Sequence, residues 1–215
     1  MRLVAAAALL APAAVATPLP AAPDCPVFPA SSVWNKPVHK LPLQKNSTAI
    51  VKSIGARLHV HADFGSGLWD GGPIRIPMTV VGSDEPKSWV RPRGWTSADA
   101  AGLPILPGLA RYDEVARGVI DHALRFTVRR SRRAYVYPAR HFASTSTSPS
   151  LPPMGLRLRL RASFPVAGFP PQARVILRAL KRYGMIVADD GSSWYVSGVP
   201  DPRWDNDQLH SLHRV

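Results

Sequence analysis

The sequence contains almost no cysteine and no long hydrophobic run. Cys25 is the only cysteine among the 215 residues, so no disulfide can form within the chain. The most apolar stretch, residues 3–11, is much shorter than the ~20 residues that a membrane-spanning helix requires. A disulfide-stabilised scaffold is therefore excluded, and no segment is a candidate membrane span.

Acidic side chains are also scarce. The chain has 14 Asp and Glu residues against 27 Lys and Arg residues, and only Glu85 and Glu114 are glutamates. The formal net charge of +13 favours an anionic partner, because the arginine side chain matches carboxylate, sulfate and phosphate groups. The alternative is that this charge serves solubility alone.

The first 16 residues have the pattern of a secretory signal peptide. Arg2 precedes the apolar run, and Ala14 and Ala16 form a small-x-small site before Thr17. The alternative is a short buried helix, which the prolines of residues 12–23 disfavour. We therefore expect a secreted or periplasmic protein. Its expected partner is an anionic polysaccharide or cell-envelope polymer, and no specific nucleic acid.

After the signal peptide 1–16, we expect a Pro/Ala-rich leader, 17–31, and a single β-rich domain, 32–215. Within the domain, residues 119–128 and 156–161 alternate between apolar and polar side chains, which predicts half-buried strands. The two prolines at 170 and 171 and the glycine at 184 delimit a predicted helix.

Shorter patterns complete the predicted domain. Turn residues at 189–191 separate two apolar runs and predict a hairpin. The connections are too short for parallel crossovers, so the predicted class is β-rich α+β, an antiparallel sandwich or open barrel with one C-terminal helix packed on the sheet. The remaining predicted segments are strands at 74–81, 134–137, 185–188 and 194–197, a basic hairpin tip at 129–133, a capped turn at 95–102, and loops at 82–94 and 144–150.

Three carboxylates are the candidates for catalysis: Asp63, Asp99 and Asp189. Hydrolysis of a glycosidic bond uses two carboxyl groups ~5 to 9 Å apart, and Asp63 could act with either of the other two. Asp99 and Asp189 also have purely structural interpretations. Asp99 could stabilise a helix N-terminus, and Asp189 is typical of a hairpin turn. Asp121 is expected to form an ion pair with Arg125.

Residues 59–63 place two histidines and one aspartate at alternate positions, a spacing that suits a metal on one face of a strand. The alternative is a set of hydrogen-bonded polar residues at a strand end, and we favour it because the further ligands are not evident. No metal or other cofactor is therefore predicted. His122 is expected to be a core histidine with satisfied hydrogen bonds.

Two groups of residues are candidates for binding a ligand. The alternation of residues 156–161 predicts an exposed basic stripe of Arg157, Arg159 and Arg161. Trp194, Tyr195 and Trp204 cluster in the sequence after a polar turn and suit the stacking of sugar rings.

Four blocks together resemble a group of uncharacterised secreted bacterial proteins: residues 94–104 (GWTSADAAGLP), 122–127 (HALRFT), 152–155 (PPMG) and 181–189 (KRYGMIVAD). The resemblance covers most of residues 28–215 but implies no activity and no catalytic residue. Members of the group carry a long additional segment with a second cysteine where this chain passes from Val81 to Gly94. The chain therefore resembles an internally shortened member.

Two classes of function follow from these features. The first is a secreted protein that binds or cleaves an anionic or cell-envelope carbohydrate. The second is a non-catalytic structural or binding protein of the envelope, or an inactive shortened paralogue. The position of the carboxylates separates the classes, because a shared cleft favours an enzyme and scattered turns favour a binding module.

Overall fold

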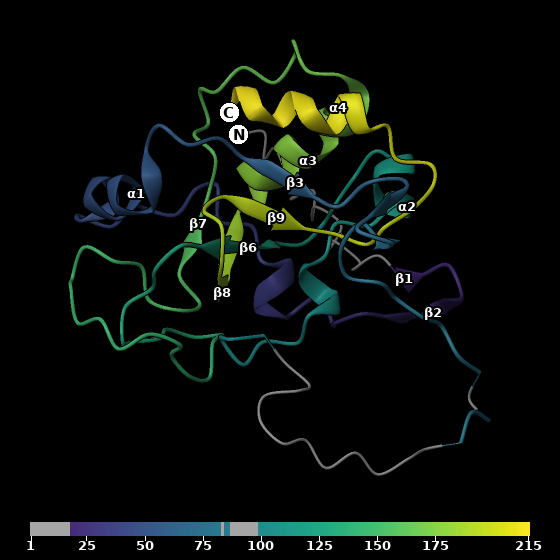
Figure 1. Cartoon of the computed structure of the whole chain (residues 1–215), viewed down its shortest axis with the longest axis horizontal. Coiled ribbons are helices and arrows are strands. Elements are labelled where there is room, and N and C mark those ends of the chain that lie inside the picture. The colour runs from purple at the N-terminus through teal and green to yellow at the C-terminus, as the bar shows by residue number, and fades with distance from the viewer. Residues whose placement is uncertain (1–17, 83, 87–98) are drawn as a thin grey trace, which may run out of the picture.

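The computed structural model describes residues 18–82, 84–86 and 99–215. The predicted signal peptide, most of the loop at 82–94 and the first part of the turn at 95–102 lie outside these residues. The centre of the fold is one open, five-stranded sheet with the strand order β3-β9-β6-β8-β7 (Figure 1). The strands are β3 (His61–Asp63), β6 (Leu124–Val128), β7 (Arg157–Leu158), β8 (Met185–Asp190) and β9 (Tyr195–Ser197).

The sheet is mixed. β3 pairs with β9 and β6 with β8 in parallel, whereas β6 and β9, and β7 and β8, are antiparallel. The predicted antiparallel sandwich or open barrel is therefore not confirmed. The described residues are also β-rich only in part, because they include more helix than strand.

The predicted hairpin of residues 185–197 is wrong, although both of its strands exist. β6 lies between β8 and β9, so the chain crosses over β6 after residue 190 instead of turning back on itself. β6 takes this central place because it is buried on both faces: Phe126 and Arg125 point to opposite sides and are both nearly inaccessible to solvent. The strand is therefore shorter than the one predicted at 119–128, and it is buried on both faces instead of one.

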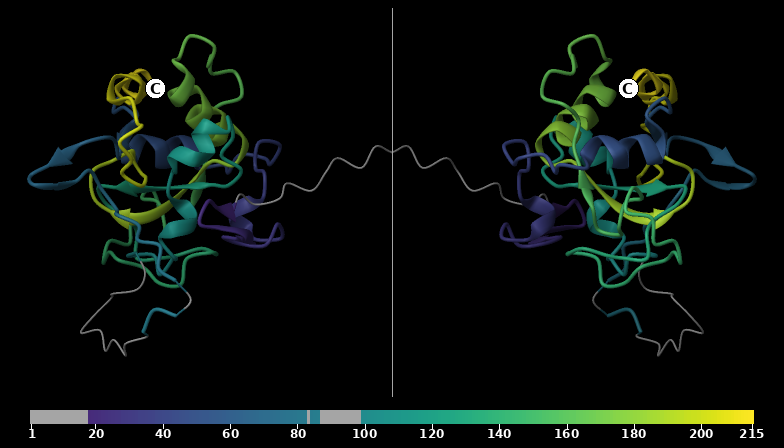
Figure 2. Two further views of the ribbon diagram at one scale, coloured as in Figure 1. Left: turned by 90° about the vertical axis from the view of Figure 1, so that its right-hand side faces the viewer. Right: turned by 90° about the vertical axis from the view of Figure 1, so that its left-hand side faces the viewer.

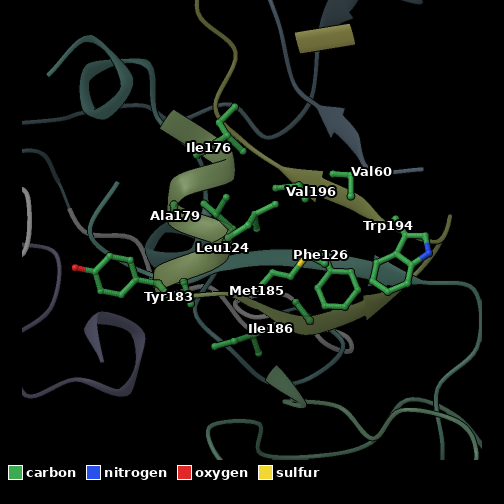
Figure 3. Close-up of a cluster of buried hydrophobic side chains, with 14 of the residues drawn as sticks. Val60, Leu124, Phe126, Ile176, Ala179, Tyr183, Met185, Ile186, Trp194 and Val196 are labelled. Carbon is green, nitrogen blue, oxygen red and sulfur yellow. The ribbon is translucent and has the colours of Figure 1, made fainter. Parts of the chain in front are cut away.

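The predicted C-terminal helix is confirmed as α3 (Pro171–Arg182). Pro171 occupies its first turn, and Gly184 follows the C-cap with φ of 72°, a conformation that glycine adopts at little cost. The apolar stripe of α3 packs on the sheet through Ile176 and Ala179, close to Leu124 of β6 (Figure 3). This layer forms the hydrophobic core.

The other helices are short. They are α1 (Ser47–Gly55), α2 (Tyr112–Ala116) and α4 (Asn206–His210), with 3-10 helices at Val33–Asn35, Leu106–Gly108 and Ser211–Arg214. Gly118 follows α2 with φ of 81°. Among the described residues, none of the helices has the length and apolar character needed to cross a membrane.

Two small hairpins lie apart from the sheet. β1 (Pro18–Leu19) and β2 (Ala22–Pro26) pair within the predicted leader. β4 (Leu68–Trp69) and β5 (Gly72–Pro73) form a hairpin that projects from the body of the molecule (Figure 2). The predicted strand at 74–81 is absent and the one at 134–137 is reduced to a single bridge between Tyr135 and Met154.

Candidate functional site

Two of the three candidate catalytic carboxylates, Asp99 and Asp189, contact one buried arginine, Arg125 of β6, and the charge of Arg125 also favours the ionised form of the third, Asp63. The Nη2 atom of Arg125 is 3.4 Å from Asp99 Oδ2 and 3.9 Å from Asp189 Oδ2, and its Nη1 donates to Ser197 Oγ at 2.9 Å. Asp63 pairs with Ser197 in the register of β3 and β9 and forms an ion pair with Arg75. A row of polar side chains therefore crosses the sheet from β3 to β8.

Asp99 is the most buried of the three carboxylates. Its Oδ1 accepts hydrogen bonds from the backbone N–H groups of Ala101 (3.1 Å) and Leu103 (2.9 Å), which closes the turn at 99–103. Burial raises the pKa of Asp99 to about 6, although Leu103 and Arg125 favour its charged form. Both oxygens are engaged, so the carboxylate holds this turn against Arg125 and the sheet.

Asp63 and Asp189 differ from Asp99 in their exposure. Burial raises the pKa of Asp63, and the hydrogen bond to Arg75 opposes that effect. The Asp189 side chain is 38% exposed. Asp99 and Asp189 thus contact Arg125, whereas Asp63 pairs with Arg75, and none of the three carboxylates lines either of the two large cavities described below.

A second cluster of charges is buried between α2 and the segment that leads into β6. Glu114 is inaccessible to solvent, and its Oε1 contacts Arg111 Nη2 at 2.5 Å and His122 Nε2 at 2.9 Å. The Nδ1 atom of His122 is 2.8 Å from the carbonyl oxygen of Ala123. Both ring nitrogens therefore face acceptors, which fits a protonated imidazole and confirms the prediction of a satisfied core histidine.

The predicted aromatic cluster is not an exposed platform. Trp194 is 8% exposed, stacks on Phe126 and donates its Nε1–H to the carbonyl oxygen of Gly55 at 2.9 Å. Trp204 is 3% exposed and donates to the carbonyl oxygen of Val199. Only Tyr195 is partly exposed. The tryptophans are core residues because each finds a carbonyl acceptor for its N–H inside the fold.

The predicted basic stripe is also corrected. Arg157 donates to the carbonyl oxygens of Tyr183, Val33 and Trp34, and Arg159 donates to those of residues 39 and 41. Burial lowers the pKa of Arg157 to about 10. The 3-10 helix at Val33–Asn35 and the irregular chain that follows it to residue 41 cover the face that was expected to meet solvent, and their carbonyl groups require donors. Of the three arginines, only Arg161 is exposed.

Of the two histidines in residues 59–63, His61 takes part in a column of rings. His61 stacks on Tyr195 with ring centroids 4.4 Å apart, and on its other side His213 lies 4.1 Å away. His213 in turn contacts His210 at 4.1 Å. Among the residues that the structure describes, no group of three His, Cys, Asp or Glu side chains is arranged to hold a metal ion.

This column predicts acid sensitivity. Burial lowers the pKa of His61 and of His213, and the neighbouring imidazoles lower both further. A histidine whose folded pKa lies below its unfolded value of 6.5 destabilises the fold as pH falls through and below that value. The His213→Phe variant should therefore lose less stability than the parent when thermal unfolding is compared at about pH 7.5 and about pH 5. An equal loss in both proteins would contradict this role for the column.

The sequence did not reveal a large cavity among the described residues, with a volume of about 560 Å³. It lies between α1, the end of β6 and the loop at 144–150. Its lining consists of two arginines, four serines and three aliphatic side chains: Arg129, Arg130, Ser53, Ser148, Ser150, Ser193, Ile54, Leu58 and Leu151. We name it the Arg–Ser cavity.

The chemistry of the Arg–Ser cavity suits an acidic, hydroxylated ligand. Arg129 and Arg130 are exposed and form no ion pair with any described residue, so both guanidinium groups are available. Serine hydroxyls donate and accept hydrogen bonds, while Ile54 and Leu151 supply an apolar floor. The only sequence signals were the basic run at 129–133, interpreted as a hairpin tip, and the serine-rich loop.

A second cavity of about 390 Å³ lies between α2, α3 and α4. It also contains two arginines, Arg174 and Arg178, but its other polar side chains are already engaged. Gln172 and Gln208 hydrogen-bond to each other's segments and to residue 205. The second cavity therefore offers charge without the serine side chains of the first, of which Ser53 already donates to the carbonyl oxygens of Ile50 and Ser150.

Comparison of the chain with protein-family models, curated proteins and solved structures finds no match to any of them.

Proposed function

We propose that this protein is a secreted or periplasmic binding protein for an acidic carbohydrate of the cell envelope, and that the Arg–Ser cavity is its binding site. The observation that carries the proposal is the composition of this cavity: two guanidinium groups without an ion-pair partner in the described part of the chain, and four serine hydroxyl groups, around an apolar floor. Such a lining complements a sugar ring, which has an apolar face, a rim of hydroxyls and, in an acidic sugar, an anionic group.

The size of the cavity supports the same class of ligand. A volume of about 560 Å³ lies within the ~300–1,000 Å³ of sites for small molecules. The strongly basic balance of the chain adds long-range attraction for a polyanion. Binding without cleavage is the form we favour, because Asp99 is enclosed and both of its oxygens hold protein groups.

Titration calorimetry with polygalacturonate tests this proposal, and heparin in a parallel titration distinguishes carboxylate from sulfate recognition. The double variant Arg129→Gln and Arg130→Gln should bind at least about tenfold more weakly, because each of the two substitutions removes a charge-assisted hydrogen bond to the ligand. The matched control is Arg174→Gln with Arg178→Gln, which removes the same charge from the second cavity. Equal losses in the two double variants would show that net charge alone attracts the polymer.

A further inference from the structure

We infer that the ligand is a polymer that extends from the Arg–Ser cavity along the segment at 129–142 to an exposed aromatic strip formed by Tyr135, Tyr137 and Phe142. This inference rests on the proposed function. It adds a second contact region and specifies a chain of several sugar units where the cavity alone would accept a single unit.

Hydrogen bonds connect the two regions. The segment that starts at the cavity wall with Arg130 runs beside residues 146–154, whose loop forms the opposite wall. Backbone hydrogen bonds join Arg132 to Pro152 (2.9 Å), residue 133 to residue 146 (2.6 Å) and Val136 to Met154 (2.9 Å). The two segments therefore form one continuous surface, with the cavity at one end and Tyr135 near the other.

The length of this surface fits several sugar units. Tyr135 follows Arg130 by five positions, and an extended chain spans at most ~3.3–3.6 Å per residue, so the path is no longer than ~18 Å. A short oligomer of an acidic sugar can therefore contact the cavity and the strip together.

The aromatic strip has the exposure that stacking needs. Tyr135 is 50% exposed, Tyr137 72% and Phe142 42%, in contrast to the buried Trp194 and Trp204. Tyrosine presents a large ring at a small cost in conformational entropy, which suits a platform for the apolar face of a sugar.

Positive charge alternates with these rings. The guanidinium group of Arg133 lies over the ring of Phe142, with its carbon 5.5 Å from the centroid, and Arg140 is exposed on the same segment. An acidic polysaccharide presents apolar ring faces and anionic groups in turn along its length. The alternation of aromatic and cationic groups therefore suits a polyanionic chain as the partner, and it suits an apolar protein surface less well.

The test compares ligands of two lengths on the same protein. Calorimetry is performed with digalacturonate and with long polygalacturonate, on the parent and on the Tyr135→Ala, Tyr137→Ala double variant. The parent should bind the long ligand at least about tenfold more tightly per site, and the double variant should lose that advantage while binding the dimer as before. Trp69→Ala is the control, since Trp69 is 78% exposed on the β4–β5 hairpin.

Each outcome has a distinct meaning. Equal affinity for both lengths, or a length advantage that survives in the tyrosine variant, overturns the extended path and leaves the cavity proposal intact. An absence of binding to either ligand contradicts the proposed function itself. As a check on folding, the Tm of the tyrosine double variant should equal that of the parent, which would establish that these exposed substitutions leave the fold unchanged.

Discussion

The Glu114→Gln variant is expected to lose about 3–5 kcal/mol of unfolding free energy, because it leaves two buried cations without their counter-charge. Glu114 accepts from the Arg111 side chain, from the Arg111 backbone N–H and from His122. Burial has the largest single effect and opposes the charged form of both Glu114 and His122, but their attraction and hydrogen bond, together with Arg111 for Glu114 and the Ala123 carbonyl for His122, outweigh it. The pKa of Glu114 is therefore lowered and that of His122 is raised. Such a loss is a large share of the ~5–15 kcal/mol that stabilises a typical domain.

Denaturant unfolding at neutral pH measures this effect, and Asp113→Asn on the same helix is the control. The Asp113 side chain is one-third exposed and contacts Arg203 on the surface, so its removal should change stability by less than about 1 kcal/mol. The variants should also differ in pH dependence. Because the folded pKa of His122 is raised, its contribution is complete below 6.5 and is lost as pH rises through the folded value. Similar midpoints for the two variants would contradict the buried cluster.

The second large effect is expected for Arg157→Gln. This change removes a guanidinium group that donates to three backbone carbonyls and joins the segment at 33–36 to the end of α3. Hydrogen bonds from charged donors contribute ~1.5–3 kcal/mol each and are not additive, so we expect a loss of about 3 kcal/mol. That corresponds to a fall of about 10 °C in Tm for a domain of this size.

Arg161→Gln is the matched control, since it removes the same charge from an exposed side chain two positions along. Its Tm should stay within about 2 °C of the parent. If Arg157→Gln instead leaves Tm unchanged and weakens retention on heparin, Arg157 belongs to an exposed binding stripe after all.

The helix α3 could be predicted because its signals are local. Pro171, the apolar spacing and Gly184 lie within one stretch of chain and require no distant partner. β8 and β9 could be located for the same reason. Their pairing could not, because β6 inserts between them from more than fifty residues away and no local pattern encodes that contact.

The alternation at 156–161 shows a second limit. It correctly separated leucines from arginines, but a period of two does not reveal what covers each face. On the polar face, the Arg157 side chain contacts carbonyl groups of the protein instead of solvent. The sequence also did not show that Asp99 and Asp189 would share the buried Arg125 as an ion-pair partner, because the three residues are far apart in the chain.

The Arg–Ser cavity could not be predicted at all. Its walls come from α1, the end of β6, the serine-rich loop and the turn before β9, which are far apart in sequence. Serine and arginine on irregular chain are typical of solvated loops, so nothing in the residues themselves indicated that these segments enclose a space.

The most direct test of the proposed function is to locate the bound ligand by NMR. Amide chemical shifts of isotope-labelled protein are followed as digalacturonate is added. The account predicts that the largest changes occur at Ser53, Ser150 and Ser193, and that residues around Arg174 in the second cavity stay unchanged. Changes centred on the second cavity, or no saturable changes at all, would contradict the assignment of the Arg–Ser cavity as the binding site.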